Sequence, residues 1–142
     1  MDINFINENN FTVFIYNNIK IDDASCFKDM LEFISIQLFN RYNYKFEGFY
    51  KVIIYNNTNI SILEFTNIND NYFLDFDVIV YKNSVILFEF FDEKLYSDKK
   101  LFYDNKYYVE YDNICDLFGL LEYGNIIYGN SVNSILNNGI LV

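Results

Sequence analysis

The residues best suited to chemistry in this sequence are carboxylates that flank two segments rich in aromatic and β-branched residues. Asp75 and Asp77 are two positions apart, so on a β-strand their side chains point to the same face. Glu89 lies in the next apolar segment, and Asp92 follows directly after that segment. Carboxylate oxygens bind Mg²⁺, and a bound metal ion can activate water for hydrolysis. These four acids therefore predict, as an alternative to a binding function, a metal site in a hydrolase or nuclease.

A lysine extends the same arrangement. Asp92 stands about fifteen residues after Asp77, and Lys94 stands two residues after Asp92, on a strand expected to pair with that of Asp77. This spacing resembles the core of the PD-(D/E)xK nucleases, and the resemblance implies that the acids hold Mg²⁺ while Lys94 assists the attacking water. The resemblance covers these three residues alone. Phe76 stands where the family usually has proline, no flanking helix is evident, and the chain is acidic where a nuclease needs a basic groove.

The same acids have a simpler interpretation as surface residues. Asp75 and Asp77 would line a solvated strand face and alternate with buried apolar neighbours. Glu64 and Glu89 each lie inside an apolar strand, where an outward-facing position is the simpler expectation. The functional interpretation of these two glutamates is an acid on a binding face or a functional buried carboxylate.

The residue types that are absent exclude several common chemistries. The chain has no histidine, so it has no Ser–His or Cys–His pair, no imidazole base and no histidine metal ligand. None of its five glycines stands in a dinucleotide-binding or phosphate-loop spacing. Cys26 and Cys115 are isolated, so we expect two small, reduced, buried residues, with a reactive thiol as the alternative. We therefore expect no catalytic residue and no cofactor.

The strongest compositional signal is acidity. Twenty acids against ten bases give a formal net charge of −10. Nucleic-acid binding depends on Lys and Arg side chains that neutralise phosphates, so direct binding to DNA or RNA is disfavoured. Binding to an anionic membrane surface is disfavoured for the same reason. Acidity of this size either serves solubility or forms a surface that docks on a basic protein.

The acids of the C-terminal third are interleaved with tyrosines, and no Lys or Arg follows Lys106. Tyrosine suits an interface because it presents a rigid apolar ring with a polar tip. We predict a partner-binding surface formed by Tyr103, Asp104, Tyr107, Tyr108, Glu110, Tyr111, Asp112, Asp116, Glu122 and Tyr123. The alternative is that codon bias and the strand preference of tyrosine explain the cluster.

One long helix is predicted in the N-terminal half of the chain. Apolar residues recur at helical spacing at Phe27, Met30, Leu31, Ile34 and Leu38. Asp22 or Asp23 can cap the start of this helix, and the helix is expected to end near Asn40. Its apolar stripe must pack on another element, which the strands around it provide.

Strands are predicted where the apolar residues alternate or form short runs bounded by turn residues. The predicted strands are 11–16, 49–55, 60–66, 73–81, 85–91, 101–103 and 107–111. Short turns between them favour antiparallel hairpins, so 73–81 is expected to pair with 85–91. A second, short helix is predicted over 113–121, followed by a less regular segment with a last short strand at 126–128.

These elements predict an α+β fold. We expect a single domain over residues 1–142, with a mostly antiparallel meander sheet of about five to seven strands on which both helices pack. The abundance of Asn, Ile, Tyr, Phe and Lys, with no Pro, indicates an AT-rich genome, such as that of a low-GC bacterium, its phage or a mobile element. We expect a cytoplasmic protein, because the sequence shows no secretory signal and no apolar run long enough to span a membrane.

Binding is the favoured function. We expect a non-enzymatic module that docks on, and inhibits, a basic partner that handles nucleic acid. Two such roles are an immunity protein or antitoxin against a toxin nuclease, and a phage-encoded inhibitor of a host defence nuclease, such as an anti-CRISPR. The alternatives are an oligomeric structural or adaptor protein, a homodimer included, and the metal-dependent hydrolase described above.

Overall fold

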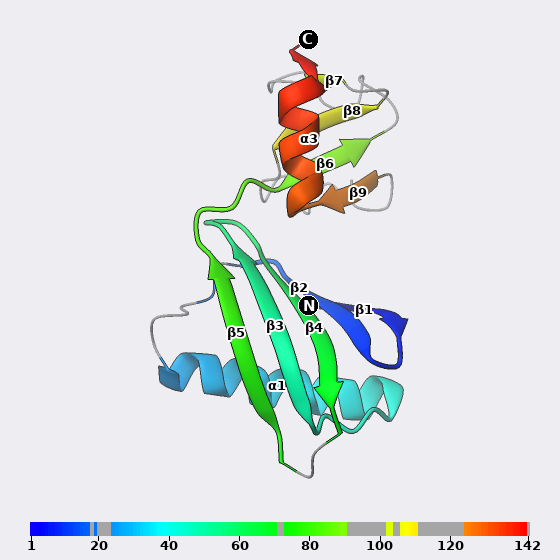
Figure 1. Cartoon of the computed structure of the whole chain (residues 1–142), viewed down its shortest axis with the longest axis vertical. Helices are drawn as coiled ribbons and strands as arrows, with labels where there is room; N and C mark the ends of the chain where they lie inside the picture. Colours follow the sequence, from blue (N-terminus) through cyan, green and yellow to red (C-terminus); the bar gives the residue numbers. More distant parts are fainter. Residues whose placement is uncertain are drawn as a thin grey trace. The chain divides into compact units, whose positions relative to one another are not determined.

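A computed structural model describes residues 1–17, 19, 24–70, 73–90, 102–103, 106–110 and 124–141 of the chain. The chain divides into two compact units (Figure 1). The N-terminal unit comprises Met1–Asn56 and Ile60–Tyr81, and the C-terminal unit comprises Asn57–Asn59 and Lys82–Val142. Each unit contains a five-stranded sheet.

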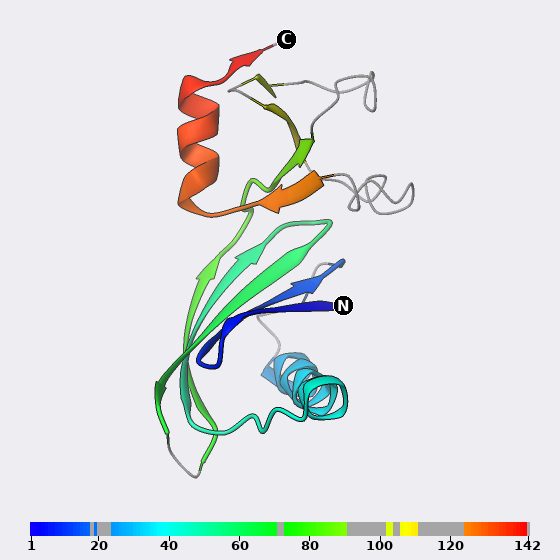
Figure 2. The same cartoon turned by 90° about the vertical axis from the view of Figure 1, so that its right-hand side faces the viewer.

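The N-terminal unit is built on its sheet. The strands are β1 (Asp2–Asn7), β2 (Asn10–Ile15), β3 (Phe49–Asn56), β4 (Ser61–Asn69) and β5 (Asp75–Tyr81). They lie in the order β1-β2-β4-β3-β5. Neighbouring strands are antiparallel except β3 and β5, which are parallel. Helix α1 (Ala24–Tyr42) packs across one face of this sheet (Figure 2).

The apolar stripe predicted for the long helix forms its contact with the sheet. Leu31, Ile34 and Leu38 are buried, and Phe27 and Met30 pack against the same core. The sheet contributes alternate residues of its strands to this core: Phe11, Val13, Tyr50, Val52, Ile54, Leu63 and Phe65. Because side chains along a strand alternate between its two faces, these residues share the face that α1 covers. The predicted helix and its core-facing stripe are confirmed.

Asn43 ends α1 and turns the chain toward β3. Its φ of 51° lies in the left-handed region, which asparagine tolerates better than most residues. The amide of Asn43 donates to the carbonyl oxygen of Phe39 at 2.9 Å, and the amide of Tyr44 donates to that of Leu38 at 3.1 Å. These bonds satisfy carbonyl groups that the end of a helix otherwise leaves without a partner.

Gly48 allows the chain to enter β3. Its φ is 113°, and a Cβ atom at this position would lie 2.7 Å from the carbonyl oxygen of Asn69. A side chain here would meet both a strained backbone and a steric overlap, so the position favours glycine. The carbonyl of Gly48 accepts a hydrogen bond from the amide of Asp75 at 3.0 Å, which joins the starts of β3 and β5.

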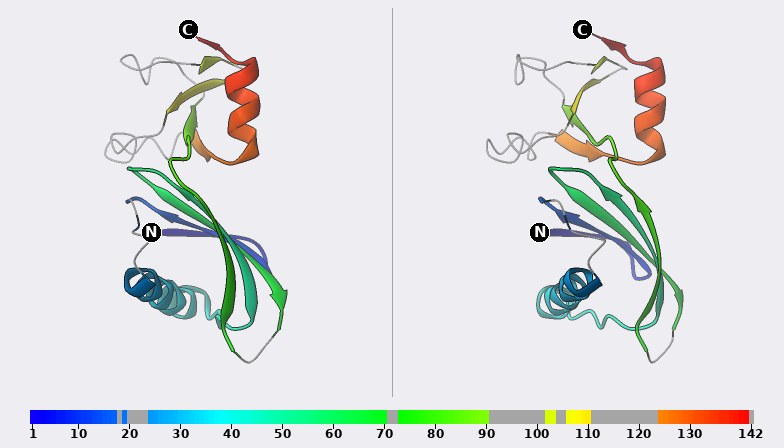
Figure 3. Two further views of the ribbon diagram at one scale, coloured as in Figure 1. Left: turned by 60° about the vertical axis from the view of Figure 1, so that its left-hand side comes forward. Right: turned by 90° about the vertical axis from the view of Figure 1, so that its left-hand side faces the viewer.

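The C-terminal unit has a smaller sheet. Its strands are β6 (Leu87–Phe90), β7 (Phe102–Tyr103), β8 (Tyr107–Glu110), β9 (Gly124–Ile127) and β10 (Ile140–Leu141), in the order β10-β7-β8-β6-β9. All its neighbouring strands are antiparallel. Helix α3 (Asn130–Asn138) packs on this sheet, with Val132 and Ile135 against Leu87 and Tyr108 (Figure 3).

The predicted α+β class is confirmed, and its strands are divided between two mostly antiparallel sheets. The hairpins β3–β4 and β7–β8 form as predicted. The predicted pairing of 73–81 with 85–91 is wrong, because β5 pairs with β3 while β6 pairs with β8 and β9. In its parallel position beside β3, β5 places Phe76, Val78 and Val80 against the core beneath α1.

Three further elements were not expected from the sequence: β1, α3 and β10. The short helix predicted over 113–121 lies outside the described residues. The expectation of a single domain stays a prediction, since two compact units can still fold as one. Among the described residues, no helix is both long and apolar enough to cross a membrane.

Candidate functional site

The carboxylates predicted as metal ligands are distributed over the two units. Asp75 and Asp77 are exposed on β5 of the N-terminal unit, alternating with Phe76 and Val78, which pack against the core. Their simpler interpretation as surface acids is thereby confirmed. Glu89 lies on β6 of the C-terminal unit, and Asp92 and Lys94 lie outside the described residues.

The strand pairing that the nuclease-like arrangement requires is not formed by β5. The resemblance required Asp77 to lie on a strand paired with the one leading to Asp92, and β5 and β6 belong to different sheets. Within the part of the chain that the structure describes, no group of three or more Cys, Asp or Glu residues is placed to hold a metal ion.

Glu89 is buried, so the expectation of an outward-facing position is wrong for this residue. Its Oε1 accepts a hydrogen bond from Nζ of Lys106, and the two atoms are 3.2 Å apart in an ion pair. A buried carboxylate is costly unless it is paired and hydrogen-bonded, and Lys106 meets both needs. Glu64, in contrast, is half-buried on the sheet face that points away from α1, so the expectation of an outward-facing position is confirmed for this residue.

The predicted tyrosine and acid surface of the C-terminal third is described in part. Tyr108 is 6% exposed and packs against α3, so it is a core residue and not a contact for a partner. Glu110 is exposed, and Tyr103 and Tyr107 lie on β7 and β8. The remaining predicted residues lie outside the described part of the chain: Asp104, Tyr111, Asp112, Asp116, Glu122 and Tyr123.

Tyrosines and acids are instead found together on the N-terminal sheet, on the face opposite α1. No described element of the N-terminal unit covers this face (Figure 2). We call it the open sheet face. Its exposed or half-buried members are Asp2, Asn4, Phe14, Lys51, Ile53, Tyr55, Glu64, Thr66, Asp75, Asp77, Ile79 and Tyr81. Thr12 and Ile62, on the same face of β2 and β4, are buried.

The parallel pairing of β3 and β5 brings side chains of the two strands together in rows on the open sheet face. Tyr81 lies beside Tyr55, and their rings stack with centroids 5.5 Å apart. Two residues earlier on each strand Ile79 lies beside Ile53, and two residues before that Asp77 lies beside Lys51. The β3–β5 pair thus presents an aromatic row, an aliphatic row and a charged row on one surface.

The open sheet face is acidic. Asp2, Glu64, Asp75 and Asp77 contribute four carboxylates, against the single ammonium group of Lys51. The two aspartates of β5 also lie on an edge strand, where charged side chains disfavour the addition of another strand. Carboxylates beside tyrosines suit contacts with Lys and Arg side chains of another protein.

A second surface lies on α1, on the side away from the sheet. Phe33, Ile36 and Phe39 are 52%, 55% and 59% exposed, although a helix that covers a sheet normally has polar residues on its outer side. We call these three residues, with the exposed acids Asp29 and Glu32, the outer face of α1.

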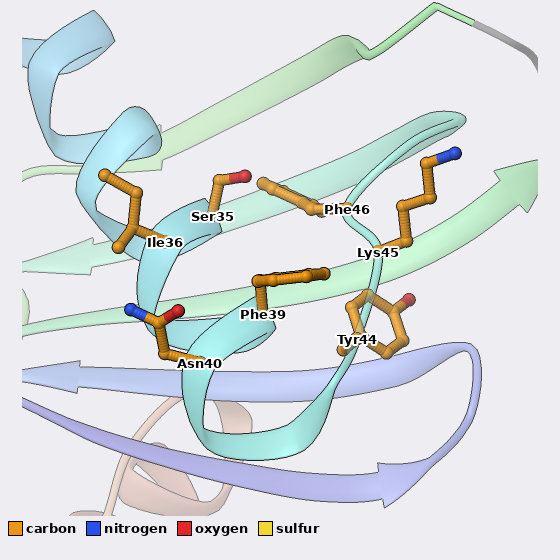
Figure 4. Close-up of a pocket in the computed structure, with 7 residues that line it drawn as sticks. All are labelled: Ser35, Ile36, Phe39, Asn40, Tyr44, Lys45 and Phe46. Atoms are coloured by element: carbon orange, nitrogen blue, oxygen red, sulfur yellow. The ribbon is translucent and has the colours of Figure 1, made fainter.

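A pocket of about 300 Å³ adjoins the outer face of α1, between the helix and the loop that leads to β3. It is lined by Ser35, Ile36, Phe39, Asn40, Tyr44, Lys45 and Phe46 (Figure 4). The side chain of Phe39 extends toward the loop between the rings of Phe46 and Tyr44, and Lys45 stands at the rim (Figure 4).

Beneath this pocket lies a cluster of aromatic rings that fixes the loop on the sheet. Phe46 is buried, and its ring centroid lies 4.9 Å from that of Tyr50 and 5.6 Å from that of Phe65. The hydroxyl groups of Tyr44 and the fully buried Tyr50 are hydrogen-bonded at 2.7 Å. Burial raises the pKa of Tyr50, and the hydrogen bond with Tyr44 raises it further.

Cys26 is exposed in the first turn of α1, so the expectation of a buried cysteine is wrong for this residue, and Cys115 lies outside the described residues.

Comparison of the chain with protein-family models, with curated proteins and with solved structures finds no match. The function therefore has to be argued from the surfaces themselves.

The sequence contained signals for both surfaces. The run from Asp75 to Val78 alternates between acidic and apolar residues, which places Asp75 and Asp77 on one strand face, and Tyr81 follows on the same face at an even spacing. In the helix, Phe33, Ile36 and Phe39 fall off the core-facing stripe, and apolar residues off that stripe indicate a second contact surface.

Proposed function

We propose that this protein is a non-enzymatic binding module that docks on, and inhibits, a basic partner that handles nucleic acid. The observation that carries the proposal is the open sheet face, which has four carboxylates together with exposed and half-buried tyrosine and isoleucine side chains. The net charge of −10 means that the chain as a whole also favours a basic partner.

The two kinds of side chain on this face have different roles in such a complex. Asp75, Asp77 and Glu64 attract Lys and Arg groups over a distance, which raises the rate of association and selects a basic surface. Tyr81 and Ile79 supply apolar area that is removed from water on contact, which slows dissociation. A nucleic-acid-binding groove is the basic surface that most nucleases present, and an acidic module seated there would exclude the substrate.

Two biological roles use this physics. One is an immunity protein or antitoxin that neutralises a toxin nuclease, and the other is a phage-encoded inhibitor of a host defence nuclease, such as an anti-CRISPR. The composition typical of an AT-rich genome supports either source. The cytoplasm of a bacterium is the compartment where both would act.

The proposal is tested by isolating the partner and altering the open sheet face. Co-expression with neighbouring genes of the native host, followed by mass spectrometry, identifies the partner. We expect Tyr81→Ala to weaken binding to the purified partner about tenfold or more, and Asp77→Asn to slow association about twofold to fivefold.

Matched controls separate a local contact from a general effect. Phe73→Ala removes another exposed aromatic ring, and Glu8→Gln removes one exposed carboxylate, both off the open sheet face. Both controls should bind as the unaltered protein does. Equal effects of variants and controls would contradict the proposed site. Thermal stabilisation by Mg²⁺ that Asp77→Asn abolishes would contradict a non-enzymatic function and favour the hydrolase.

A further inference from the structure

Strand β5 forms one edge of the N-terminal sheet (Figure 1). With seven residues it is the longest of the described edge strands, since β1, β9 and β10 have six, four and two. An edge strand presents a row of backbone N–H and C=O groups that can pair with a strand of another chain. Among the described edges, β5 therefore offers the longest row of such groups.

The pairing with β3 determines which backbone groups of β5 point to this edge. The amide of Asp75 donates to the carbonyl oxygen of Gly48 on the β3 side. Because successive residues of a strand direct these groups to alternate sides, those of Phe76, Val78 and Val80 point to the edge. The amide of Phe76 donates to Oδ1 of Asp75 at 2.8 Å. In the part of the chain that the structure describes, no strand pairs with Val78 and Val80 on this side.

The opposite edge of the same sheet, β1, is partly covered by side chains of α1. Nη1 of Arg41 donates to the carbonyl oxygen of Met1 at 3.4 Å. The hydroxyl of Tyr42 donates to the carbonyl oxygen of Ile3, also at 3.4 Å. Groups that cover an edge protect it from the addition of a strand. Strand addition is therefore favoured at β5 over β1.

The side chains of β5 define the residues that an added strand would need. Its side chains would alternate between the two faces of the sheet. On the α1 side they would lie beside Phe76, Val78 and Val80, which pack against the core. On the open sheet face they would lie beside Asp75 and Asp77, which are exposed. Opposite charges and apolar pairs stabilise neighbouring strands, so the added strand should alternate between apolar and basic residues.

The charges around the start of β5 have an excess of acid. Three exposed acids lie at this end of the sheet: Asp70, Asp75 and Asp77. Lys51 on β3 lies beside Asp77, and the only other described charges here, Lys45 and Glu47, are paired with each other. Within the described residues neither Asp75 nor Asp77 forms an ion pair. Lys82 follows the other end of β5, so basic residues of an added strand belong beside the two aspartates.

We propose that the basic partner adds an extended segment to the open edge of β5, with two Lys or Arg residues, two positions apart, beside Asp75 and Asp77. Apolar residues of the segment alternate with them and lie beside Val78 and Val80. The inference rests on the proposed function for the existence of the partner and adds the way in which it binds. A second copy of β5 would bring further aspartates to this edge, so the acids select against self-association and for a basic segment.

The test is amide hydrogen exchange of the full chain, measured by NMR with and without a peptide. The peptide alternates lysine and valine over about seven residues, the length of β5. We expect the amides of Val78 and Val80 to exchange about tenfold or more slowly in the bound state. The amides of Asp77 and Ile79, which face β3, are the internal reference and should be protected in both states. The same peptide with N-methylated amides keeps its charges, cannot donate to a strand, and should not protect Val78 and Val80.

A charge reversal tests the role of the aspartates. The double variant Asp75→Lys with Asp77→Lys should lose affinity for the lysine–valine peptide about tenfold or more and bind a glutamate–valine peptide instead. The matched control, Glu8→Lys with Asp29→Lys, makes the same change in net charge at exposed positions away from β5. This control should still prefer the lysine–valine peptide. A control that changes its preference as the double variant does would overturn the inference.

The exchange experiment with the isolated partner separates this inference from the proposed function. Protection of Val78 and Val80 by the partner supports strand addition. A partner whose binding Tyr81→Ala weakens, but which leaves both amides unprotected, would overturn strand addition and leave the proposed function intact. A lysine–valine peptide that protects neither amide, or protects them no better than its N-methylated form, would also overturn it. Absence of any basic partner would contradict the proposed function, whatever the peptides do.

Discussion

Tyr50 is a residue in which burial and protonation are directly linked. Its ring is fully buried among Phe46, Phe65 and Phe76, and its hydroxyl is hydrogen-bonded to that of Tyr44 at 2.7 Å. An ionised phenol in this position would lose its hydration without gaining a cation. Burial therefore raises the pKa of Tyr50 above the ordinary value of about 10.

The raised pKa of Tyr50 predicts a loss of stability at alkaline pH. Above pH of about 10 the unfolded chain releases this proton while the native state keeps it, so deprotonation favours unfolding. The contribution of Tyr50 is complete below that pH and falls by up to about 1.4 kcal/mol for each further pH unit. Urea unfolding across this range should give a shallower decline for Tyr50→Phe than for Tyr81→Phe, which alters an exposed tyrosine. Equal slopes would contradict the burial argument.

At the scale of elements, the entry into β3 depends on one backbone conformation. Gly48 has a φ of 113° and no room for a Cβ atom next to the carbonyl of Asn69. We expect Gly48→Ala to lower the free energy of unfolding by about 1–3 kcal/mol, the cost of a strained backbone. Asn43→Gly, at the end of α1 where φ is also positive, should change it by less than about 0.5 kcal/mol. Thermal or urea unfolding measures both, and a neutral Gly48→Ala variant would contradict this reasoning.

The elements also show what local sequence patterns could and could not predict. The core-facing stripe of α1 and the β3–β4 hairpin follow from periodicity and turn residues, which are local signals. The parallel pairing of β5 with β3 joins strands separated by β4, and no local signal distinguishes it from a hairpin with β6. Helix α3 has the run Asn130–Asn138, in which several asparagines obscure its two buried residues, Val132 and Ile135.

The open sheet face could not be predicted as a site either, because local sequence patterns do not show which strands pair. The residues Asp75, Asp77 and Tyr81 could be assigned to one strand face, but their neighbours Lys51 and Tyr55 come from a strand that pairs with β5 only in the folded chain. Tyr108 shows the opposite error. It was predicted as an interface residue because it is a tyrosine in an acidic segment, but its ring packs in the core under α3.

At the scale of the whole molecule, charge is the property that connects the proposed function to the structure. The chain has a net charge of −10, and the open sheet face places four of its carboxylates beside apolar groups on a surface that α1 leaves uncovered. A second surface, the apolar outer face of α1, lies on the other side of the N-terminal sheet.

The most direct test of the central claim is the salt dependence of the association rate between the full chain and its isolated partner. Attraction between carboxylates and basic groups is screened by ions, whereas apolar contact is not. We predict that the association rate constant falls about tenfold or more between about 0.05 M and about 0.5 M salt, with a smaller change in the dissociation rate constant. An association rate constant that stays the same over this range would contradict docking by the acidic face.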